Sequence, residues 1–376
     1  PTVAFYECGK GGWIHLHGGF PALEAGTRQL LGCTAHDDRE AIADAVSRWD
    51  AADLEDALAA AGLCGARART PEEWLAHDQG AALADLPVVE VLRIGEADPR
   101  PLPAADRPLR GVRVLDLTRV LAGPTAGRTL AAHGADVLRV GSPHLPSIEP
   151  FVIDTGHGKR SCHLDLDTRA GADTLRSLVA EADVFTSGYR AGSLDKRGFG
   201  PEALAAIRPG LVYVSINAYG YVGPWRERPG WEQLAQTATG VAVEQGSSAR
   251  PQLLPAAATD YTTGYLAAYG AIVARHRQAT EGGSWWVRVS LAQTAMWVLR
   301  AGSIAESDAG SPAGPGDLAE HMIESDTAWG QLTHLGPALH MSVTPPVWER
   351  PTAPLGTHAP VWLDRDERST AVSTRP

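Results

Sequence analysis

Two acidic residues, Glu232 and Asp260, stand near the start of expected helices and are the first candidates for chemistry. A carboxylate can serve as a nucleophile or exchange a proton during a reaction. It can equally stabilise the first turn of a helix, where free N–H groups attract negative charge. Residue type alone favours this second role: Asp260 would cap a helix that begins at Tyr261, and Glu232 would interact with the dipole of its own helix.

Several common nucleotide and hydrolase motifs are absent from the sequence. The turn at residues 117–124 has no Gly-x-Gly-x-x-Gly pattern, so no nicotinamide or flavin cofactor is expected. The sequence also has no Gly-x-x-x-x-Gly-Lys-Ser/Thr loop and no Gly-x-Ser-x-Gly turn. His15 and His17 would share one face of a strand, but no carboxylate or cysteine stands at metal-ligand spacing from them. We therefore expect no metal.

The composition is that of a folded globular chain with an acidic balance. It has 376 residues, of which 44% are hydrophobic and 20% charged, and its formal net charge is -11. Nucleic-acid binding needs a concentrated basic surface, so no nucleic-acid partner is expected. The sequence contains no apolar run of the roughly 18 residues that a membrane span needs, and its four cysteines are too scattered for a disulfide framework. We therefore expect a cytoplasmic protein with no membrane partner.

The elements that must position these residues fall into two regions of different pattern. Residues 1–95 combine short strands with alanine-rich helices and indicate a small domain. Residues 96–106 are rich in proline and indicate a linker. From residue 107 onward strands alternate with helices, which is typical of a parallel sheet covered on both faces. The strands expected there are 112–117, 135–140, 162–166, 182–186, 211–216 and 285–289, and the main helices are 168–181, 201–207, 231–239, 260–278 and 291–300.

The expected fold class is α/β, with a Rossmann-like parallel sheet, helices on both of its faces and a smaller α+β domain. The large domain would span residues 107–302. A second linker at 303–317 would lead to residues 318–345, which return to the small domain, and residues 346–376 would form an extended tail. Open parallel sheets bind ligands outside the carboxyl ends of their strands, so the site is expected at that end of the large domain.

Six motifs occur in order over residues 111–300. They are Val112–Pro124, Gly158–Ser161, Gly188–Gly200, Leu211–Ile216, Gly223-Pro224 with Arg228–Gly230, and Ala258–Asp260. Together they resemble signatures of the class III coenzyme A transferases, the superfamily that includes formyl-CoA transferase, carnitine CoA-transferase and α-methylacyl-CoA racemase. Residues 13–91 resemble the small domain that follows the nucleotide-binding domain in most relatives, so the order of segments is rearranged in this chain.

The resemblance implies transfer of coenzyme A between an acyl-CoA donor and a carboxylic acid acceptor. In relatives the aspartate that matches Asp260 attacks the acyl thioester, forms an anhydride and then carries CoA as an aspartyl thioester. Racemases of the family have a histidine base where Trp231 stands. Transferase relatives tend to have an aromatic residue followed by an acid, as in Trp231-Glu232. The resemblance therefore favours transfer, with Asp260 and Glu232 as catalytic residues.

The resemblance also implies a binding site for CoA, which is a substrate here. Cations are needed for its phosphates even on an acidic protein. The implied binding residues are Leu121, Ala122 and Gly123 at the mouth, Tyr189 beside the adenine or pantetheine, and Lys159, Arg160 and Lys196 at the nucleotide end. Arg190 is a further implied CoA-binding residue. A homodimer is implied as well. Two alternatives stay open: racemisation or isomerisation of an acyl-CoA, and a non-catalytic acyl-CoA-binding subunit.

Overall fold

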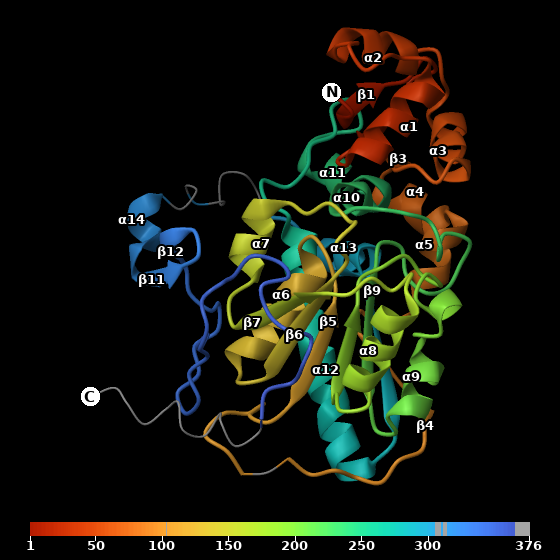
Figure 1. The fold of residues 1–376 in the computed structure, drawn as a ribbon. Coiled ribbons are helices and arrows are strands. Elements are labelled where there is room, and N and C mark those ends of the chain that lie inside the picture. The colour runs from red at the N-terminus through yellow and green to blue at the C-terminus, as the bar shows by residue number, and fades with distance from the viewer. Residues whose placement is uncertain (103, 305–309, 311–313, 365–376) are drawn as a thin grey trace.

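A seven-stranded sheet forms the centre of the computed structural model, which describes residues 1–102, 104–304, 310 and 314–364 (Figure 1). The strand order is β4-β10-β9-β8-β5-β6-β7, and only β4 runs antiparallel to its neighbour. The strands are β4 (Glu90–Gly95), β5 (Arg113–Leu117), β6 (Asp136–Gly141), β7 (Lys159–His163), β8 (Val184–Ser187), β9 (Val212–Asn217) and β10 (Ser284–Ser290). The expected α/β class is confirmed.

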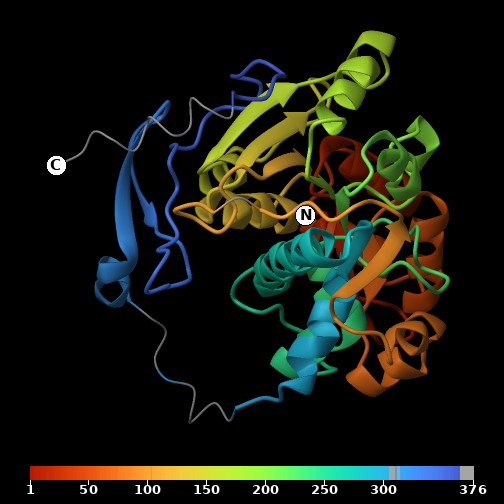
Figure 2. The ribbon, with the colours of Figure 1, turned by 90° about the horizontal axis from the view of Figure 1, so that it is seen from below.

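Helices cover both faces of this sheet, as the view from below shows (Figure 2). Successive residues of a strand point to opposite faces, so Val114 joins one apolar core and Leu115 the other. Because both faces of the sheet are covered by apolar cores, the strand sequences are nearly continuous runs of hydrophobic residues. One core includes α6 (Ala122–Ala132), α12 (Ala258–Glu281) and α13 (Leu291–Arg300), and the other includes α8 (Arg169–Val179) and α9 (Pro201–Ile207).

Helices α6 and α12 approach each other closely near their first turns. A Cβ atom added at Gly264 of α12 would lie 2.5 Å from the carbonyl oxygen of Ala122. Only glycine permits this approach, because any side chain would overlap the backbone of α6. The contact holds the beginning of α12, including Asp260, beside the beginning of α6.

The first unit of the chain is a three-stranded antiparallel sheet in the order β1-β2-β3 with its own helices. Figure 1 shows it at one end of the large sheet, next to α10. At the start of α4, Thr70 and Glu73 form a reciprocal capping box. Its elements are β1 (Val3–Glu7), β2 (Trp13–His17), β3 (Gly65–Arg67), α1 (Pro21–Leu31), α2 (Arg39–Val46), α3 (Ala51–Ala60), α4 (Pro71–Ala76) and α5 (Asp78–Leu83).

The structure differs from the sequence at the boundary expected after residue 95. Strand β4, which the sequence placed in the small domain, is the edge strand of the large sheet and pairs with β10. Its residues Val91 and the preceding Val89 pack against the core of the large sheet. Pairing with a strand almost two hundred residues later is a tertiary event that local pattern does not encode.

A second difference concerns residues 318–345, expected to return to the small domain. Here β11 (Met322–Thr327) and β12 (Gly330–Leu335) pair with each other as a separate hairpin, after the short α14 (Pro315–Leu318). Figure 1 places this hairpin away from the first unit. It contacts α7 (Glu149–Thr155) and the residues after it: the Trp329 indole donates to Glu149, and the rings of His334 and His157 stack.

The described part of the tail, residues 346–364, is extended, without helix or strand, and lies along the β7 side of the large sheet. The backbones of Gly158 and Arg350 are joined by a hydrogen bond, and Trp348 and Trp362 pack against the two cores. Residues 305–309 and 311–313 of the expected linker and 365–376 of the expected tail lie outside the described residues. Within the described ranges, no helix has the length and apolar character to cross a membrane.

Candidate active site

A cleft of about 620 Å³ opens at the carboxyl ends of the parallel strands, where the sequence places the ligand site. Its walls come from the turn after β5, the loops after β6, β8 and β9, the start of α12 and the first unit. Both candidate acids, Asp260 and Glu232, line it. The fold therefore brings together residues from segments that are far apart in the sequence.

Asp260 lies in the first turn of α12 and does not cap its own helix. The N-cap residue is Ala257, and no side chain makes a cap hydrogen bond there. Instead the Asp260 carboxylate lies close to the backbone N–H of Ala122, at the start of α6, which lowers its pKa. The capping role favoured by residue type alone is therefore wrong. The carboxylate faces the positive end of a neighbouring helix and the cleft.

Glu232 begins α10 (Glu232–Thr239) and is 3% exposed. One of its carboxylate oxygens accepts hydrogen bonds from the side chain of Gln236 and from both the hydroxyl and the backbone N–H of Thr259. Because Thr259 directly precedes Asp260, Glu232 fixes the start of α12. From the sequence, Glu232 was expected to interact with the dipole of its own helix. In the structure it also binds Thr259 at the start of α12.

The pKa values of both carboxyl groups are raised. Burial raises the pKa of Asp260 well above its ordinary value, the negative charge of Glu232 raises it further, and the Ala122 N–H works in the opposite direction. Burial also raises the pKa of Glu232, against its hydrogen bonds from Gln236 and Thr259. Among the described residues neither carboxylate has an ion-pair partner. The site thus places two acids together without a compensating cation.

The turn between β5 and α6 carries backbone strain. Val120 has φ 67°, and among the described residues it is the one non-glycine residue with positive φ. A β-branched residue rarely adopts this conformation, so the surrounding contacts must hold it. The turn directs the start of α6, and with it the Ala122 N–H, toward Asp260.

A buried polar network lies beneath this turn. Asp116 accepts hydrogen bonds from the hydroxyls of Thr118 and Thr186, and pairs with Lys159 at 2.9 Å. Lys159 also donates to the carbonyl oxygen of Pro124 in α6. Burial lowers the pKa of Lys159 to about 8, although Asp116 acts in the opposite direction. The network ties β5, β7 and α6 together directly behind the cleft.

The residues implied for CoA binding divide into two groups. Leu121, Ala122, Gly123, Tyr189 and Arg190 line the cleft. Lys159, Arg160 and Lys196 do not. Lys159 is held in the buried network, Arg160 is buried and reaches Asp136 and the carbonyl oxygen of Val361, and Lys196 is exposed on the short 3-10 turn Asp195–Arg197.

The first unit supplies one wall of the cleft, which the sequence did not reveal. Phe20, Leu23 and Cys64 line it together with Trp231. The Trp231 ring stacks on His17 of β2, with centroids 5.0 Å apart, and packs against Phe20. Trp231 thus joins the start of α10 to the first unit, although no local signal in either segment indicates that they meet.

The cleft also contains cations that the sequence did not single out. Arg119 packs its guanidinium over the Phe20 ring and donates to the carbonyl oxygen of Pro146, and Arg228 donates to the carbonyl oxygen of Glu55. Within the described ranges neither has a carboxylate partner. Their unmatched positive charge suits an anionic ligand in an otherwise acidic protein.

Comparison with known proteins agrees with this fold. The family model of CoA-transferase family III matches residues 109–326. An acyl-CoA transferase of Gibberella moniliformis is 34% identical over 315 residues, covering 77% of this chain and 55% of that protein. The human succinyl-CoA:glutarate CoA-transferase is 35% identical over 184 residues, or 45% of this chain and 41% of that protein. A crystal structure of Rv3272 from Mycobacterium tuberculosis shares the fold, with TM-score 0.61 and 20% identity over 69% of this chain and 99% of that chain.

The fold and these matches define an α/β protein built around a large, mostly parallel sheet. The chain belongs to CoA-transferase family III, as the sequence motifs predict. It spans about half the length of the first curated relatives that it matches, 55% and 54% of their residues.

Proposed function

We propose that this protein transfers coenzyme A from an acyl-CoA donor to a carboxylic acid acceptor through an aspartyl-CoA thioester on Asp260. The observation that carries the proposal is the position of the Asp260 carboxylate, in the cleft and against the first N–H of α6. The N–H and the helix dipole favour the ionised, nucleophilic form. They also lie where negative charge develops when a carbonyl is attacked.

The proposed reaction balances with no reactants other than the acyl-CoA, the acceptor acid and Asp260, which gives one oxygen to the donor acid and regains one from the acceptor. The Asp260 carboxylate attacks the donor thioester, expels CoA thiolate and forms a mixed anhydride. The thiolate then attacks the aspartyl carbonyl of the anhydride, which releases the donor acid and leaves CoA on Asp260 as a thioester. The acceptor carboxylate attacks that thioester, and the thiolate released attacks the acceptor carbonyl of the new anhydride. The product acyl-CoA departs and the Asp260 carboxylate is restored.

Glu232 has a positioning role in this proposal. Its hydrogen bonds to Thr259 hold the first turn of α12, and its charge keeps the pKa of Asp260 high. A high pKa makes the Asp260 carboxylate a stronger nucleophile once ionised, and the cleft supplies the N–H that favours ionisation. CoA itself would lie along the cleft walls formed by Leu121, Gly123 and Tyr189.

Racemisation has less support in the site. The position of the racemase histidine is held by Trp231, which has no basic nitrogen, and the histidine nearest to it in the structure, His17, stacks against its ring. Burial lowers the pKa of His17 to about 4, and His17 does not line the cleft. His144 does line the cleft, but it is exposed and pairs with Asp165. We also propose a homodimer, which rests on the family resemblance, and a cytoplasmic location, which rests on the scattered cysteines.

The proposal is tested by incubating the protein with a panel of acyl-CoAs and carboxylic acids and identifying new acyl-CoAs by mass spectrometry. We expect transfer for at least one donor and acceptor pair, and none from Asp260→Ala. Binding of CoA without transfer would support the non-catalytic alternative. Exchange of α-deuterium from an acyl-CoA without any acceptor would support isomerisation. Light scattering that gives a monomer with full activity would rule out the homodimer.

A further inference from the structure

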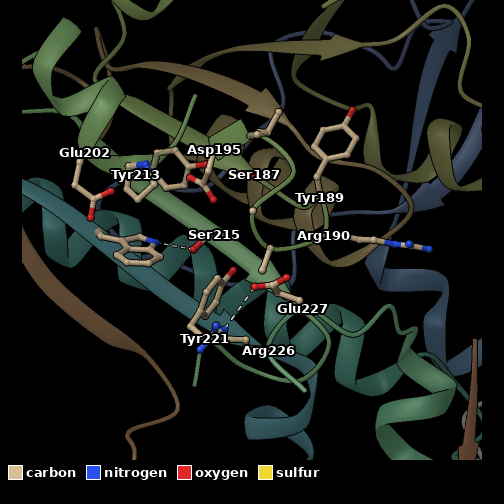
Figure 3. A pocket seen from close by; sticks show the side chains of 15 residues that line it. Ser187, Tyr189, Arg190, Asp195, Glu202, Tyr213, Ser215, Tyr221, Arg226 and Glu227 are labelled. Carbon is tan, nitrogen blue, oxygen red and sulfur yellow. Dashed lines mark hydrogen bonds and ion pairs between the residues drawn. The ribbon is translucent and has the colours of Figure 1, made fainter. Parts of the chain in front are cut away.

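A second pocket, of about 310 Å³, lies beside the active-site cleft (Figure 3). Asp260 and Glu232 line only the cleft, whereas five residues line both: Tyr189, Arg190, Ala191, Leu194 and Arg226. The second pocket is formed by the ends of β8, β9 and β10, the start of α9 and the loop at residues 221–227. Its volume is that of a site for a small molecule, and the proposed transfer reaction does not use it.

Aromatic rings form the inner wall of this second pocket. The Trp286 indole N–H donates to the Ser215 hydroxyl at 2.7 Å, and its ring meets Tyr221 edge to face, with centroids 5.7 Å apart. Tyr213 stacks on Phe185. These contacts fix the rings, so the wall is already formed. The Arg288 guanidinium, which does not line the pocket, lies 5.0 Å from the Trp286 centroid and 5.7 Å from the Tyr221 centroid, so both rings already make a cation–π contact.

Acidic side chains face these rings without a matching positive charge. Asp195 and Glu202 line the second pocket, and among the described residues neither forms an ion pair. In Figure 3 both lie near Tyr213. Burial raises the pKa of Tyr213, and the charges of Asp195 and Glu202 raise it further, so both charges act on this wall.

The arginines in and near the second pocket do not neutralise Asp195 and Glu202, because each has another partner. Arg226 pairs with Glu227 at 3.6 Å. Arg190 extends away from the other labelled side chains in Figure 3 and donates to the carbonyl oxygen of Gly62. Arg288 does not line the pocket and pairs with Glu90. The groups that remain are two carboxylates opposite an aromatic wall.

We propose that this second pocket binds a small organic cation, of the quaternary ammonium type, between the aromatic wall and the carboxylates of Asp195 and Glu202. The rings attract the cation through their negative faces, and the carboxylates supply the opposite charge. An anion would face two unpaired acids, and a neutral apolar ligand would leave those acids without compensation when it covers them. The inference is independent of the transferase reaction, because it uses neither Asp260 nor the cleft.

The test is a calorimetric titration of the full chain with choline and with its uncharged isostere dimethylbutanol, in which carbon replaces the quaternary nitrogen. We expect saturable binding of choline at one site and much weaker binding of the isostere. Glu202→Gln and Asp195→Asn should each weaken choline binding about fivefold, as expected for one charge at contact distance. Trp286→Phe should weaken it about threefold, because phenylalanine binds cations less well than tryptophan.

The control variant is Glu244→Gln, which removes an exposed acid of α11 (Val241–Gln245) outside the second pocket and should leave choline binding unchanged. Asp195 and Glu202 are exposed, so their replacement should not prevent folding, and circular dichroism checks this. Equal binding of choline and its isostere would overturn the proposal. So would the absence of saturable choline binding, or unchanged affinity in both acid variants.

Discussion

Two acidic clusters, one around Asp116 and one around Asp260, lie at the same end of the large sheet and differ in how their charges are paired. Asp116 is matched by the Lys159 ammonium and by two threonine hydroxyls. Asp260 lies near a second acid, Glu232, and close to a single backbone N–H. Pairing makes the first cluster a support for the β5–α6 turn. The unmatched charges of the second make it costly to ionise, which is consistent with the nucleophilic role proposed for Asp260. The comparison separates the residues that support the site from Asp260, the residue proposed to react.

The largest expected effect is the loss of transfer activity when Asp260, the proposed nucleophile, is replaced. Asp260→Asn keeps the size and the hydrogen-bond acceptor but cannot form the anhydride. Transfer should fall at least about a thousandfold, as it does when a covalent nucleophile is removed. Steady-state assays with the best donor and acceptor pair measure this, and binding of CoA should be retained. Activity within tenfold of the original protein would show that Asp260 does not carry the acyl or CoA group.

Breaking the Asp116–Lys159 pair should lower the stability of the protein rather than the rate of transfer. Lys159→Met leaves the Asp116 carboxylate buried without its cation, which should lower the free energy of unfolding by about 3–5 kcal/mol. Urea denaturation measures this, with Arg169→Met as the control. Arg169 pairs with Asp173 on the surface, and its loss should cost less than about 1 kcal/mol. If Lys159→Met instead left stability unchanged and raised the KM for the acyl-CoA, Lys159 would be a CoA-binding residue.

Removing one charge of the acidic pair should shift the pH profile. The Glu232 charge raises the pKa of Asp260, so Glu232→Gln should lower it and move the acid limb of kcat toward lower pH. The rate at the optimum should fall by roughly tenfold, because the neighbouring group tunes the nucleophile. A pH series of kcat measures both. An acid limb that stays in place while only stability falls would assign Glu232 a purely structural role.

The smallest expected effect is a gain in stability from the same Asp260→Asn variant. A carboxyl group whose pKa is higher in the folded state destabilises that state as pH rises from the unfolded pKa, about 3.9, toward the folded one. Asparagine has no charge to bury, so the melting temperature should rise by about 2–4 °C at pH 8. The gain should shrink toward pH 4, where Asp260 is protonated. A gain that does not change with pH would contradict the raised pKa.

The parts predicted from sequence are those that local pattern specifies. Alternating strands and helices indicated the parallel sheet, and the Ala258–Asp260 motif with Trp231-Glu232 indicated both acids of the cleft. Residues 13–17 and 64 gave no sign that they approach Trp231, because that contact joins distant segments. Lys159 looked like a phosphate-binding cation in a Gly-Lys-Arg-Ser turn. Its burial depends on Asp116, which lies 43 residues earlier in the sequence, and no local pattern reports such pairing.

The measurement that tests the central claim most directly is mass spectrometry of peptides after incubation with an acyl-CoA and a trapping reagent. Hydroxylamine converts an aspartyl thioester to a hydroxamate, and borohydride reduces it to an alcohol. We predict a mass change on the peptide that contains Asp260, which depends on the acyl-CoA and is absent in Asp260→Asn. An unmodified Asp260 peptide in protein that turns over its substrates, or a modification at another residue, would contradict the account.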